Sequence, residues 1–252
     1  MNNTAPRSSK VVAVTGAGTG IGRATAHAFA AQGAHVIAIG RRGEPLKETA
    51  AGHHRITPLP ADITGENEPD RIARAVEERH GRLDVLVNNA GIVRSGALGT
   101  LTQENVTAQL ATNLVAPILL AQATLPLLEA SGGAIVNVST SVGQRAWPGN
   151  AVYAATKTAL ELLTRSWAVE LAPRGVRVVA VAPGAIDTPI GEHQGLTPEQ
   201  RSAVRQWQLA HTPMGRIGRP EEVAWSITQL TAPAASFVTG VVLPVDGGAV
   251  VA

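Results

Sequence analysis

The sequence predicts an α/β fold with a parallel sheet that is covered by helices on both faces. Short runs rich in Val and Ile alternate along the chain with longer amphipathic segments rich in Ala and Leu, and a glycine-rich turn follows the first such run. This alternation is typical of parallel sheets. With 252 residues, of which 44% are hydrophobic, the chain has enough apolar material for a core on each face.

Seven runs are predicted to be the strands of one sheet. They cover residues 10–15, 35–40, 55–59, 83–88, 133–139, 176–182 and 241–246. Helices are predicted near residues 20–32, 67–80, 102–130, 151–173 and 220–231, with a smaller one near 197–211. We found no internal repeat and no low-complexity linker, so residues 10–252 are expected to form a single domain.

Two segments fall outside this regular pattern. Residues 1–9 lack an apolar signal segment and are expected to be a flexible tail before the first strand. Residues 190–215 are polar and stand where a short turn would suffice. Loops of this length are often lids or binding loops, so we expect residues 190–215 to cover a substrate.

Composition and charge argue against several classes of protein. The chain has no cysteine, which excludes disulfides and thiolate metal sites and fits a reducing cytoplasm. The seven histidines show no metal-ligand spacing, so no metal is expected. A net charge of +2 without a basic stripe argues against nucleic acid. No uninterrupted apolar run approaches the roughly 18 residues of a membrane span, so no membrane partner is expected.

The turn after the first strand has the pattern of a phosphate-binding loop. Residues 15–22 read TGAGTGIG and lead into an Ala-rich helix. Gly16, Gly20 and Gly22 allow a tight turn and a close approach of the backbone to a pyrophosphate, and the start of the next helix offers free N–H groups. Thr19 and Ile21 lie in the same loop. The alternative is a tight strand–helix turn without a ligand.

The end of the second strand favours a phosphorylated ribose. An acidic residue at this place binds the ribose 2′-hydroxyl, whereas an arginine accommodates a 2′-phosphate. Residues 37–43 contain no acid but include Arg41 and Arg42. This favours NADP(H) over NAD(H) as cofactor. The alternative is that the two arginines only solvate a surface turn.

Over residues 10–248 the sequence resembles the short-chain dehydrogenase/reductase family, in its compact branch of about this length. The motifs occur in the family's order: TGAGTGIG, ADIT with Asp62, NNAG (88–91), ATNLVAP with Asn113, YAATK, PGAIDT (183–188), GRPEEVA and VDGG. The resemblance implies a doubly wound Rossmann domain with a seven-stranded parallel sheet flanked by helices on both faces.

The resemblance also implies which residues bind the cofactor. Asp62 and Ile63 are expected at the adenine, and Asn89, Ala90 and Gly91 at the adenosine ribose. Around the nicotinamide and its amide, the resemblance implies Pro183, Gly184, Ile186 and Thr188.

Tyr153, the only tyrosine, lies four residues before Lys157 in a predicted helix, so both face the same side. A free phenol has a pKa of about 10, and a neighbouring ammonium together with a nearby, positively charged oxidised nicotinamide favours the phenolate. The resemblance implies that Tyr153 is the general acid/base of a carbonyl reduction or alcohol oxidation. It also implies that Tyr153 and Lys157 both contact the cofactor, Lys157 at its ribose. The alternative is a buried tyrosine beside a solvated lysine.

Asn113 lies in a long predicted helix, four residues before Pro117. Because proline has no N–H, the carbonyl of Asn113 loses its helical partner and the helix should kink there. In the family this carbonyl binds a water linked to the catalytic lysine, which implies a proton relay to Tyr153. A kink made only for packing is the alternative.

The catalytic hydroxyl departs from the family's pattern. The consensus places a serine three residues before a glycine and thirteen before the tyrosine, and both counts lead to Thr140. Threonine keeps a hydroxyl that can bond the substrate oxygen. We therefore assign this role to Thr140, with Ser141 as the alternative and Ser139 as a weaker one.

The substrate pocket is expected to follow Thr140 and the NNAG turn. Ser141, Val142, Gln144, Arg145 and Trp147 are the predicted substrate residues. Val93, Arg94 and, within residues 190–215, His193, Trp207, Leu209 and His211 are further candidates. Arg94 or Arg145 would suit an acidic or phosphopantetheine-bearing substrate, and Trp147 suggests an apolar wall.

The leading interpretation is a cytoplasmic, NADP(H)-dependent oxidoreductase that interconverts a ketone and a secondary alcohol. A 3-oxoacyl thioester or polyketide-type ketoreductase is the alternative among enzymes, and a non-catalytic nicotinamide-binding protein is the alternative from another class. An enoyl reductase is disfavoured, because the family's enoyl-reducing members usually space the tyrosine and lysine more widely. The resemblance implies a homotetramer or a homodimer.

Overall fold

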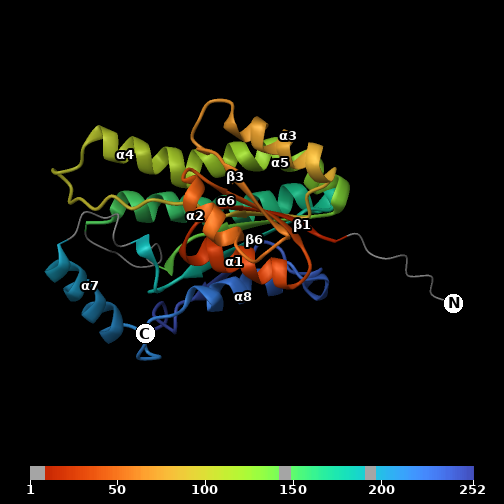
Figure 1. The fold of residues 1–252 in the computed structure, drawn as a ribbon. Coiled ribbons are helices and arrows are strands. Elements are labelled where there is room, and N and C mark those ends of the chain that lie inside the picture. The colour runs from red at the N-terminus through yellow and green to blue at the C-terminus, as the bar shows by residue number, and fades with distance from the viewer. Residues whose placement is uncertain (1–8, 142–148, 191–196) are drawn as a thin grey trace.

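The computed structural model describes residues 9–141, 149–190 and 197–252. Within them, seven parallel strands form one sheet in the order β3-β2-β1-β4-β5-β6-β7. Figure 1 shows this sheet between two layers of helices, which confirms the predicted fold class. The strands are β1 (Val11–Thr15), β2 (His35–Gly40), β3 (Ile56–Pro60), β4 (Val85–Asn88), β5 (Ala134–Val138), β6 (Arg177–Pro183) and β7 (Val242–Val245).

The helices agree with the predicted ones except in two places. They are α1 (Gly20–Ala31), α2 (Gly43–Ala50), α3 (Glu68–His80), α4 (Gln103–Leu110), α5 (Ala116–Ser131), α6 (Ala151–Leu171), α7 (Pro198–Ala210) and α8 (Pro220–Leu230), with single turns η3 (Ala172–Arg174) and η5 (Pro233–Ala235). Helix α2 was not predicted. Its sequence, GEPLKETA, buries only Leu46 and Thr49, so it carries almost no apolar periodicity.

The second difference is a break in the long helix predicted over residues 102–130. A π-helical turn, η1 (Ala111–Val115), separates α4 from α5 and is centred on Asn113. The N–H of Ala116 bonds the carbonyl of Ala111, which is five residues earlier. Pro117 follows directly, and its missing N–H prevents a regular α-helical ladder here. The sequence predicts a kink at this place, and the structure has a π turn there.

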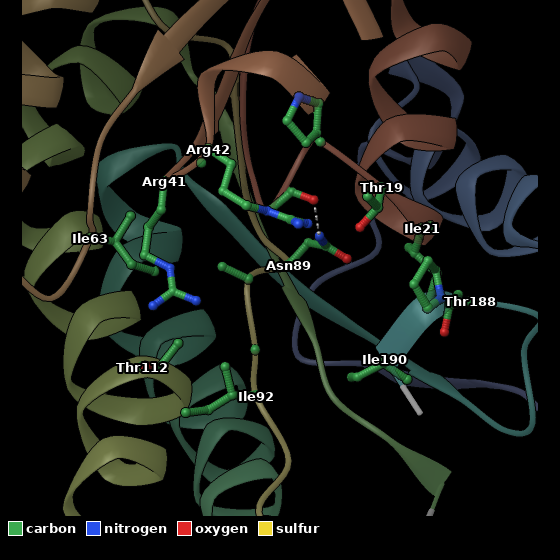
Figure 2. Close-up of a pocket in the computed structure, with 18 of the residues that line it drawn as sticks. Thr19, Ile21, Arg41, Arg42, Ile63, Asn89, Ile92, Thr112, Thr188 and Ile190 are labelled. Atoms are coloured by element: carbon green, nitrogen blue, oxygen red, sulfur yellow. Dashed lines mark hydrogen bonds between the residues drawn. The ribbon is translucent and has the colours of Figure 1, made fainter. Parts of the chain in front are cut away.

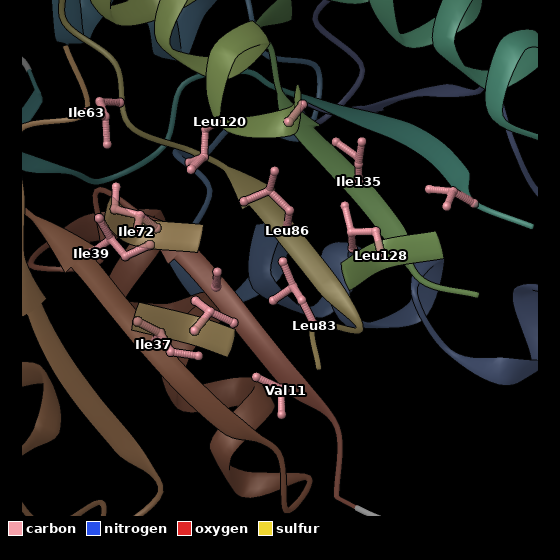
Figure 3. Packing of buried hydrophobic residues seen from close by; sticks show 14 of the residues in the cluster. Val11, Ile37, Ile39, Ile63, Ile72, Leu83, Leu86, Leu120, Leu128 and Ile135 are labelled. Atoms are coloured by element: carbon pink, nitrogen blue, oxygen red, sulfur yellow. The ribbon is translucent and has the colours of Figure 1, made fainter. Parts of the chain in front are cut away.

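Strand side chains alternate between two hydrophobic cores, one on each face of the sheet. On one face, Val11, Leu86 and Ile135 pack with Ile72 of α3 and Leu120 of α5, as Figure 3 shows. On the other face, the intervening residues of the same strands pack with Phe29 of α1, Leu46 of α2 and Ile227 of α8. Because parallel strands are buried on both faces, they appear as unbroken Val/Ile runs in the sequence.

The helical stretch Gln103–Ser131 is long and apolar enough to span a membrane by length and composition alone. It has 29 residues, a mean hydropathy of 1.5 in its most apolar window, and one third of that window is buried. This differs from the expectation drawn from uninterrupted apolar runs. The core helix of a soluble protein passes the same test, and α5 contributes Leu120 and Leu128 to the core shared with α3.

The sheet order reverses between β1 and β4, since β1 continues to β2 on one side while β4 continues to β5 on the other. In open α/β sheets, ligands bind in the crevice beyond the carboxyl ends of the strands at such a reversal. The loops after β1, β2, β4, β5 and β6 all meet at this edge, where the sequence motifs lie.

Candidate active site

The loop between β1 and α1 forms an open anion cradle. Gly16 has a φ of +65°, and a Cβ there would lie 2.9 Å from Nδ2 of Asn89. Helix α1 begins at Gly20, Thr19 makes no side-chain cap bond, and no acidic residue lies in the first turn. The helix N-terminus therefore keeps its free N–H groups and its positive end toward the crevice.

A cavity of about 450 Å³ opens in front of this cradle. Figure 2 shows Arg41 and Arg42 pointing into it from the end of β2, with Thr112, Ile92 and Ile190 on its other walls. The structure brings together in its lining Gly16, Thr19, Gly20, Ile21, Arg41, Arg42, Asp62, Ile63, Asn89, Ala90, Gly91 and Thr188 of the predicted cofactor residues. Its dimensions and its glycine cradle fit a dinucleotide.

Six predicted cofactor residues lie outside this lining. Tyr153 and Lys157 belong to the cluster described below, and the other four have packing contacts. A Cβ on Gly22 would collide with the carbonyl oxygen of Gly16, so this glycine lets α1 pack against the loop. A Cβ on Gly184 would lie 2.6 Å from Cβ of Asp246. Ile186 forms a parallel bridge with Gly218, and Pro183 ends β6. Pro183, Gly184 and Ile186 belong to the segment that carries Thr188 to the cavity.

The side chain of Thr15 connects the glycine loop after β1 to the NNAG turn after β4. This residue was not singled out from the sequence. Its hydroxyl donates to the carbonyl of Val87 and accepts from the backbone N–H groups of Asn89 and Ala90, both at 3.0 Å. In return, Nδ2 of Asn89 donates to the carbonyl of Thr15 at 2.8 Å. The loops after β1 and β4 are therefore held together at the floor of the cavity.

Helix α2, which follows Arg41 and Arg42, is tied to the same cradle. Arg23 of α1 donates to the carbonyl of Gly18 and to the carboxylate of Glu48, and Thr49 donates to the carbonyl of Ala17 at 3.0 Å. These contacts fix the position of α2 relative to the glycine loop.

Asp62, which also lines the cavity, accepts hydrogen bonds from the N–H and the hydroxyl of Thr64 through one carboxylate oxygen.

Tyr153, Thr140 and Lys157 meet where β5 ends against α6. The side chain of Tyr153 hydrogen-bonds that of Thr140. Nζ of Lys157 lies 6.0 Å from the centre of the Tyr153 ring and donates to the carbonyl of Val138 at 2.8 Å. A Cβ on Gly91 would lie 3.3 Å from this Nζ, so the cluster adjoins the cavity wall.

Burial dominates the acid–base properties of the cluster. It raises the pKa of Tyr153 to about 12, against the opposing effect of the Thr140 hydrogen bond. It also lowers the pKa of Lys157 to about 8. From the sequence, a phenolate is expected when Lys157 and an oxidised nicotinamide both lie beside the ring. For the protein alone the neutral phenol is favoured, because the loss of hydration is the largest effect on the pKa of Tyr153.

The side chain of Asn113 links the two halves of the site. Its Oδ1 accepts from the N–H of Ile92 at 2.8 Å, and its Nδ2 donates to the carbonyl of Ile92 at 2.9 Å and to the hydroxyl of Thr156 at 3.3 Å. Thr156 in turn donates to the carbonyl of Tyr153. The segment after β4 and the first turns of α6 are thus held by one buried amide.

The three neighbouring hydroxyls have different surroundings. Ser139 is turned toward α6, where it donates to Oε1 of Glu161 at 2.7 Å. Thr140 faces Tyr153, and its hydroxyl also lies 3.5 Å from the carbonyl oxygen of Pro183. Ser141 is buried at the end of the described segment. Of the three, Thr140 is the one that contacts Tyr153.

Four of the five predicted substrate residues lie outside the described residues, namely Val142, Gln144, Arg145 and Trp147, and so does the further candidate His193. Val93 and Arg94 line the cavity. Trp207 stacks on His211 with ring centres 4.1 Å apart, on the exposed helix α7. Arg205 of this helix pairs with Asp187 at 3.2 Å, which connects α7 to the segment that carries Thr188.

Comparison with known proteins adds to this geometry. A sequence model of a family described as enoyl-(acyl carrier protein) reductase matches residues 16–250. A 3-oxoacyl-[acyl-carrier-protein] reductase of Thermotoga maritima is 40% identical over 247 residues, which cover 96% of this chain and 98% of that protein. The chain belongs to the short-chain dehydrogenase/reductase family.

Other relatives also match over nearly the whole chain. The cis-4-hydroxycyclohexanecarboxylate dehydrogenase of Sinomonas cyclohexanicum is 40% identical over 248 residues, 95% of this chain and 96% of its own length. Among solved structures, a 3-ketoacyl-(acyl-carrier-protein) reductase from Brucella melitensis, complexed with NADH, superposes with a TM-score of 0.88 at 32% identity. The match covers 96% of this chain and 98% of that one. This chain is therefore an oxidoreductase of the family.

Among the described residues, no group of three or more His, Asp or Glu side chains is placed to hold a metal ion. The cavity and the Tyr153 cluster instead present backbone amides, arginines and hydroxyls, which suit a nucleotide cofactor and a carbonyl group. Chemistry of that kind depends on an organic cofactor for the hydride.

Proposed function

We propose that this protein is an NADP(H)-dependent oxidoreductase that interconverts a ketone and a secondary alcohol. The observation that carries the proposal is the hydrogen bond between Tyr153 and Thr140, beside the buried Lys157 and next to a cavity with a phosphate cradle. When bound, the nicotinamide supplies or accepts the hydride. The protein then has to bind the carbonyl oxygen and move one proton.

Tyr153 is the proposed proton donor and acceptor. With a pKa near 12, its phenol keeps its proton at neutral pH and can donate it to the oxygen of a ketone as that oxygen gains charge. Thr140 orients the same oxygen with its hydroxyl. In the oxidation direction the phenol must lose its proton, and the positive charge of a protonated Lys157 then favours the phenolate.

Lys157 and Asn113 are proposed to support this proton transfer. Lys157 reaches the cluster and the cavity wall at Gly91, where it would bind the ribose hydroxyls of the cofactor. Asn113 stands in a π turn, a form that occurs often at functional sites. Its main-chain carbonyl is the proposed site of a water that connects Lys157 with solvent.

The preference for NADP(H) rests on Arg41 and Arg42. Both line the cavity at the end of β2, where a ribose 2′-phosphate would lie, and no acidic residue occupies the place that binds a free 2′-hydroxyl. The hydrogen bonds from Arg23 and Thr49 to the glycine loop fix helix α2, which begins just after Arg42. Two guanidinium groups can form charge-assisted hydrogen bonds with a phosphate.

A 3-oxoacyl thioester is the second candidate substrate. Relatives in Thermotoga maritima and Vibrio cholerae carry the name 3-oxoacyl-[acyl-carrier-protein] reductase, at 40% and 37% identity. The four-residue spacing of Tyr153 and Lys157 continues to favour carbonyl over enoyl reduction. Arg94, which lines the cavity, and Arg145 are the proposed contacts for an acidic or phosphopantetheine-bearing substrate.

Assembly and location are part of the proposal. Leu110, Val115 and Leu119 on α4, η1 and α5, and Leu162 and Val169 on α6, are exposed apolar side chains. Contact between copies would cover them, so we expect a homotetramer or a homodimer in the cytoplasm. Residues 190–215, which include α7, remain the proposed substrate lid.

The test is loss of absorbance of the reduced nicotinamide, with NADPH and NADH in parallel. The panel contains aromatic ketones, cyclic ketones, β-keto esters and an acetoacetyl thioester. Turnover that favours NADPH supports the proposal, and the best carbonyl identifies the substrate class. Equal or better use of NADH would contradict the role of Arg41 and Arg42. Binding of both cofactors without consumption of either would favour a non-catalytic nicotinamide-binding protein.

A further inference from the structure

Gln109 is a fully buried amide that binds the backbone of Arg94 from helix α4. Its Oε1 accepts from the N–H of Arg94 at 3.1 Å, and its Nε2 donates to the carbonyl of the same residue at 3.2 Å. The Nε2 group also donates to the carbonyl of Asn105 at 3.3 Å. Its solvent exposure is 0%, so all of its polar contacts are made inside the protein.

Gln109 and Asn113 act as a pair. They are four residues apart on one helical run, and each binds both the N–H and the carbonyl of one residue, Arg94 and Ile92 respectively. Four residues of an α-helix rise about 6 Å. Two residues of an extended chain advance about 6.6 Å. The spacing of the two side-chain amides along the helix therefore matches the spacing of Ile92 and Arg94 along an extended segment.

The segment needs such partners because it leaves the sheet. Strand β4 ends at Asn88, and residues 89–97 form no strand or helix. An unpaired buried backbone group costs free energy comparable to a lost hydrogen bond. Beyond Arg94, the hydroxyl of Ser95 donates to Oδ1 of Asn150, and the N–H of Gly96 donates to the carbonyl of Gly149, just before α6.

The tethered segment is a wall of the cavity. Ile92, Val93 and Arg94 all line it. Gly91, directly before them, adjoins Nζ of Lys157. A shift of this wall would change both the width of the cavity and the approach to the Tyr153 cluster.

We propose that Gln109 is a positioning residue for the reaction, which holds the backbone of Arg94 so that the wall formed by Ile92, Val93 and Arg94 keeps its place against cofactor and substrate. This inference rests on the proposed function for its kinetic readout. It concerns a residue that contacts no reacting atom and acts only through the segment that it binds.

The test replaces Gln109 by Met, which has a similar length and cannot make the two backbone bonds. Thr124→Val is the matched control, since Thr124 is also fully buried but bonds only carbonyls of its own helix, at Leu120 and Ala121. Thermal midpoints, dissociation constants for NADPH and NADH by nicotinamide fluorescence, and kcat and KM for a ketone are measured for each folded variant.

Gln109→Met is expected to lower kcat/KM on the order of 10- to 100-fold, mostly through KM, and to weaken binding of the nicotinamide cofactor. Thr124→Val is expected to lower the thermal midpoint without changing either constant. If Gln109→Met loses stability but keeps wild-type dissociation constants and KM, the inference is overturned.

Gln109→Glu is the second variant, in case Gln109→Met does not fold. Its carboxylate still accepts from the N–H of Arg94 but, when ionised, cannot donate to the carbonyl. A loss smaller than that of Gln109→Met, or a clear loss on its own, supports the inference, and wild-type binding contradicts it. If the wild type binds NADPH or NADH but reduces no carbonyl, the proposed function fails, and the dissociation constants of the variants still decide the role of Gln109.

Discussion

The two halves of the site are built in different ways. The cofactor half follows the strand–turn sequence from β1 to β4 and presents glycine backbone, a free helix N-terminus and two arginines. The catalytic half joins α4, η1, β5 and α6, and it depends on the buried polar side chains of Gln109, Asn113, Thr140 and Lys157. The cofactor half offers groups that line an open cavity, whereas the polar side chains of the catalytic half are buried.

This difference has a consequence for stability. A buried polar group costs free energy unless it has a hydrogen-bond partner, and a buried charge costs more. Both polar atoms of the Asn113 and Gln109 side chains have hydrogen-bond partners. Lys157 has one carbonyl partner, that of Val138, and its lowered pKa shows that burial still disfavours its charge. The catalytic half therefore contains the costliest group of the site.

A large effect should separate two adjacent hydroxyls of the catalytic half. Thr140→Ala removes the group that contacts Tyr153 and is expected to lower kcat about 100- to 1000-fold, the usual loss for one oriented donor. Ser139→Ala is the matched control. It should leave kcat close to wild type but lower the free energy of unfolding by about 1–3 kcal/mol, because it leaves Oε1 of Glu161 without this donor.

Steady-state kinetics and urea unfolding of both variants measure the contrast. A large loss of kcat in Ser139→Ala, with Thr140→Ala unaffected, would transfer the catalytic role to Ser139.

A smaller effect is expected in the cofactor half. Replacing Arg41 and Arg42 together by Ala removes two charge-assisted hydrogen bonds to a 2′-phosphate and should weaken NADPH binding by about 10- to 100-fold. NADH, which lacks this phosphate, should bind with unchanged affinity. Fluorescence titration of both cofactors tests this, and parallel losses for NADPH and NADH would mean that the arginines do not read the 2′-phosphate.

A third prediction concerns the pH dependence of stability at Lys157. The pKa falls from 10.5 to about 8 on folding, so below pH 8 the folded wild type bears the whole cost of a buried ammonium. Between these values the unfolded chain binds a proton that the folded chain does not, and the wild type gains stability as the pH rises. Lys157→Met should therefore be more stable than wild type by up to about 3 kcal/mol at pH 7.

This advantage should shrink as the pH rises above 8. Urea unfolding without cofactor at pH 7 and pH 9.5 measures it. A variant that is less stable than wild type at pH 7 would show that the bond from Lys157 to Val138 outweighs the cost of burying the charge.

Sequence reasoning succeeded where a local motif sets the structure. The Val/Ile runs placed all seven strands within two residues of their ends, and the glycine loop, NNAG and Asp62 all reached the cavity. It missed α2, because the segment has only one buried apolar side chain. It also missed Thr15 and Gln109, because a polar residue that bonds a distant backbone leaves no periodic pattern in the sequence.

The acid–base properties of the site were also beyond sequence reasoning. The four-residue spacing of Tyr153 and Lys157 indicates that they share a helix face, but it does not give the depth of burial. That depth decides whether the lysine or the loss of hydration controls the pKa of the phenol.

The most direct test of the account is the Tyr153→Phe variant, measured for both NADPH binding and carbonyl reduction. Removal of a positioned acid is expected to lower kcat by about 100- to 10,000-fold. Because the cofactor cavity is formed by other side chains, the dissociation constant for NADPH should stay close to that of the wild type. Undiminished turnover would contradict the central claim that Tyr153 transfers the proton.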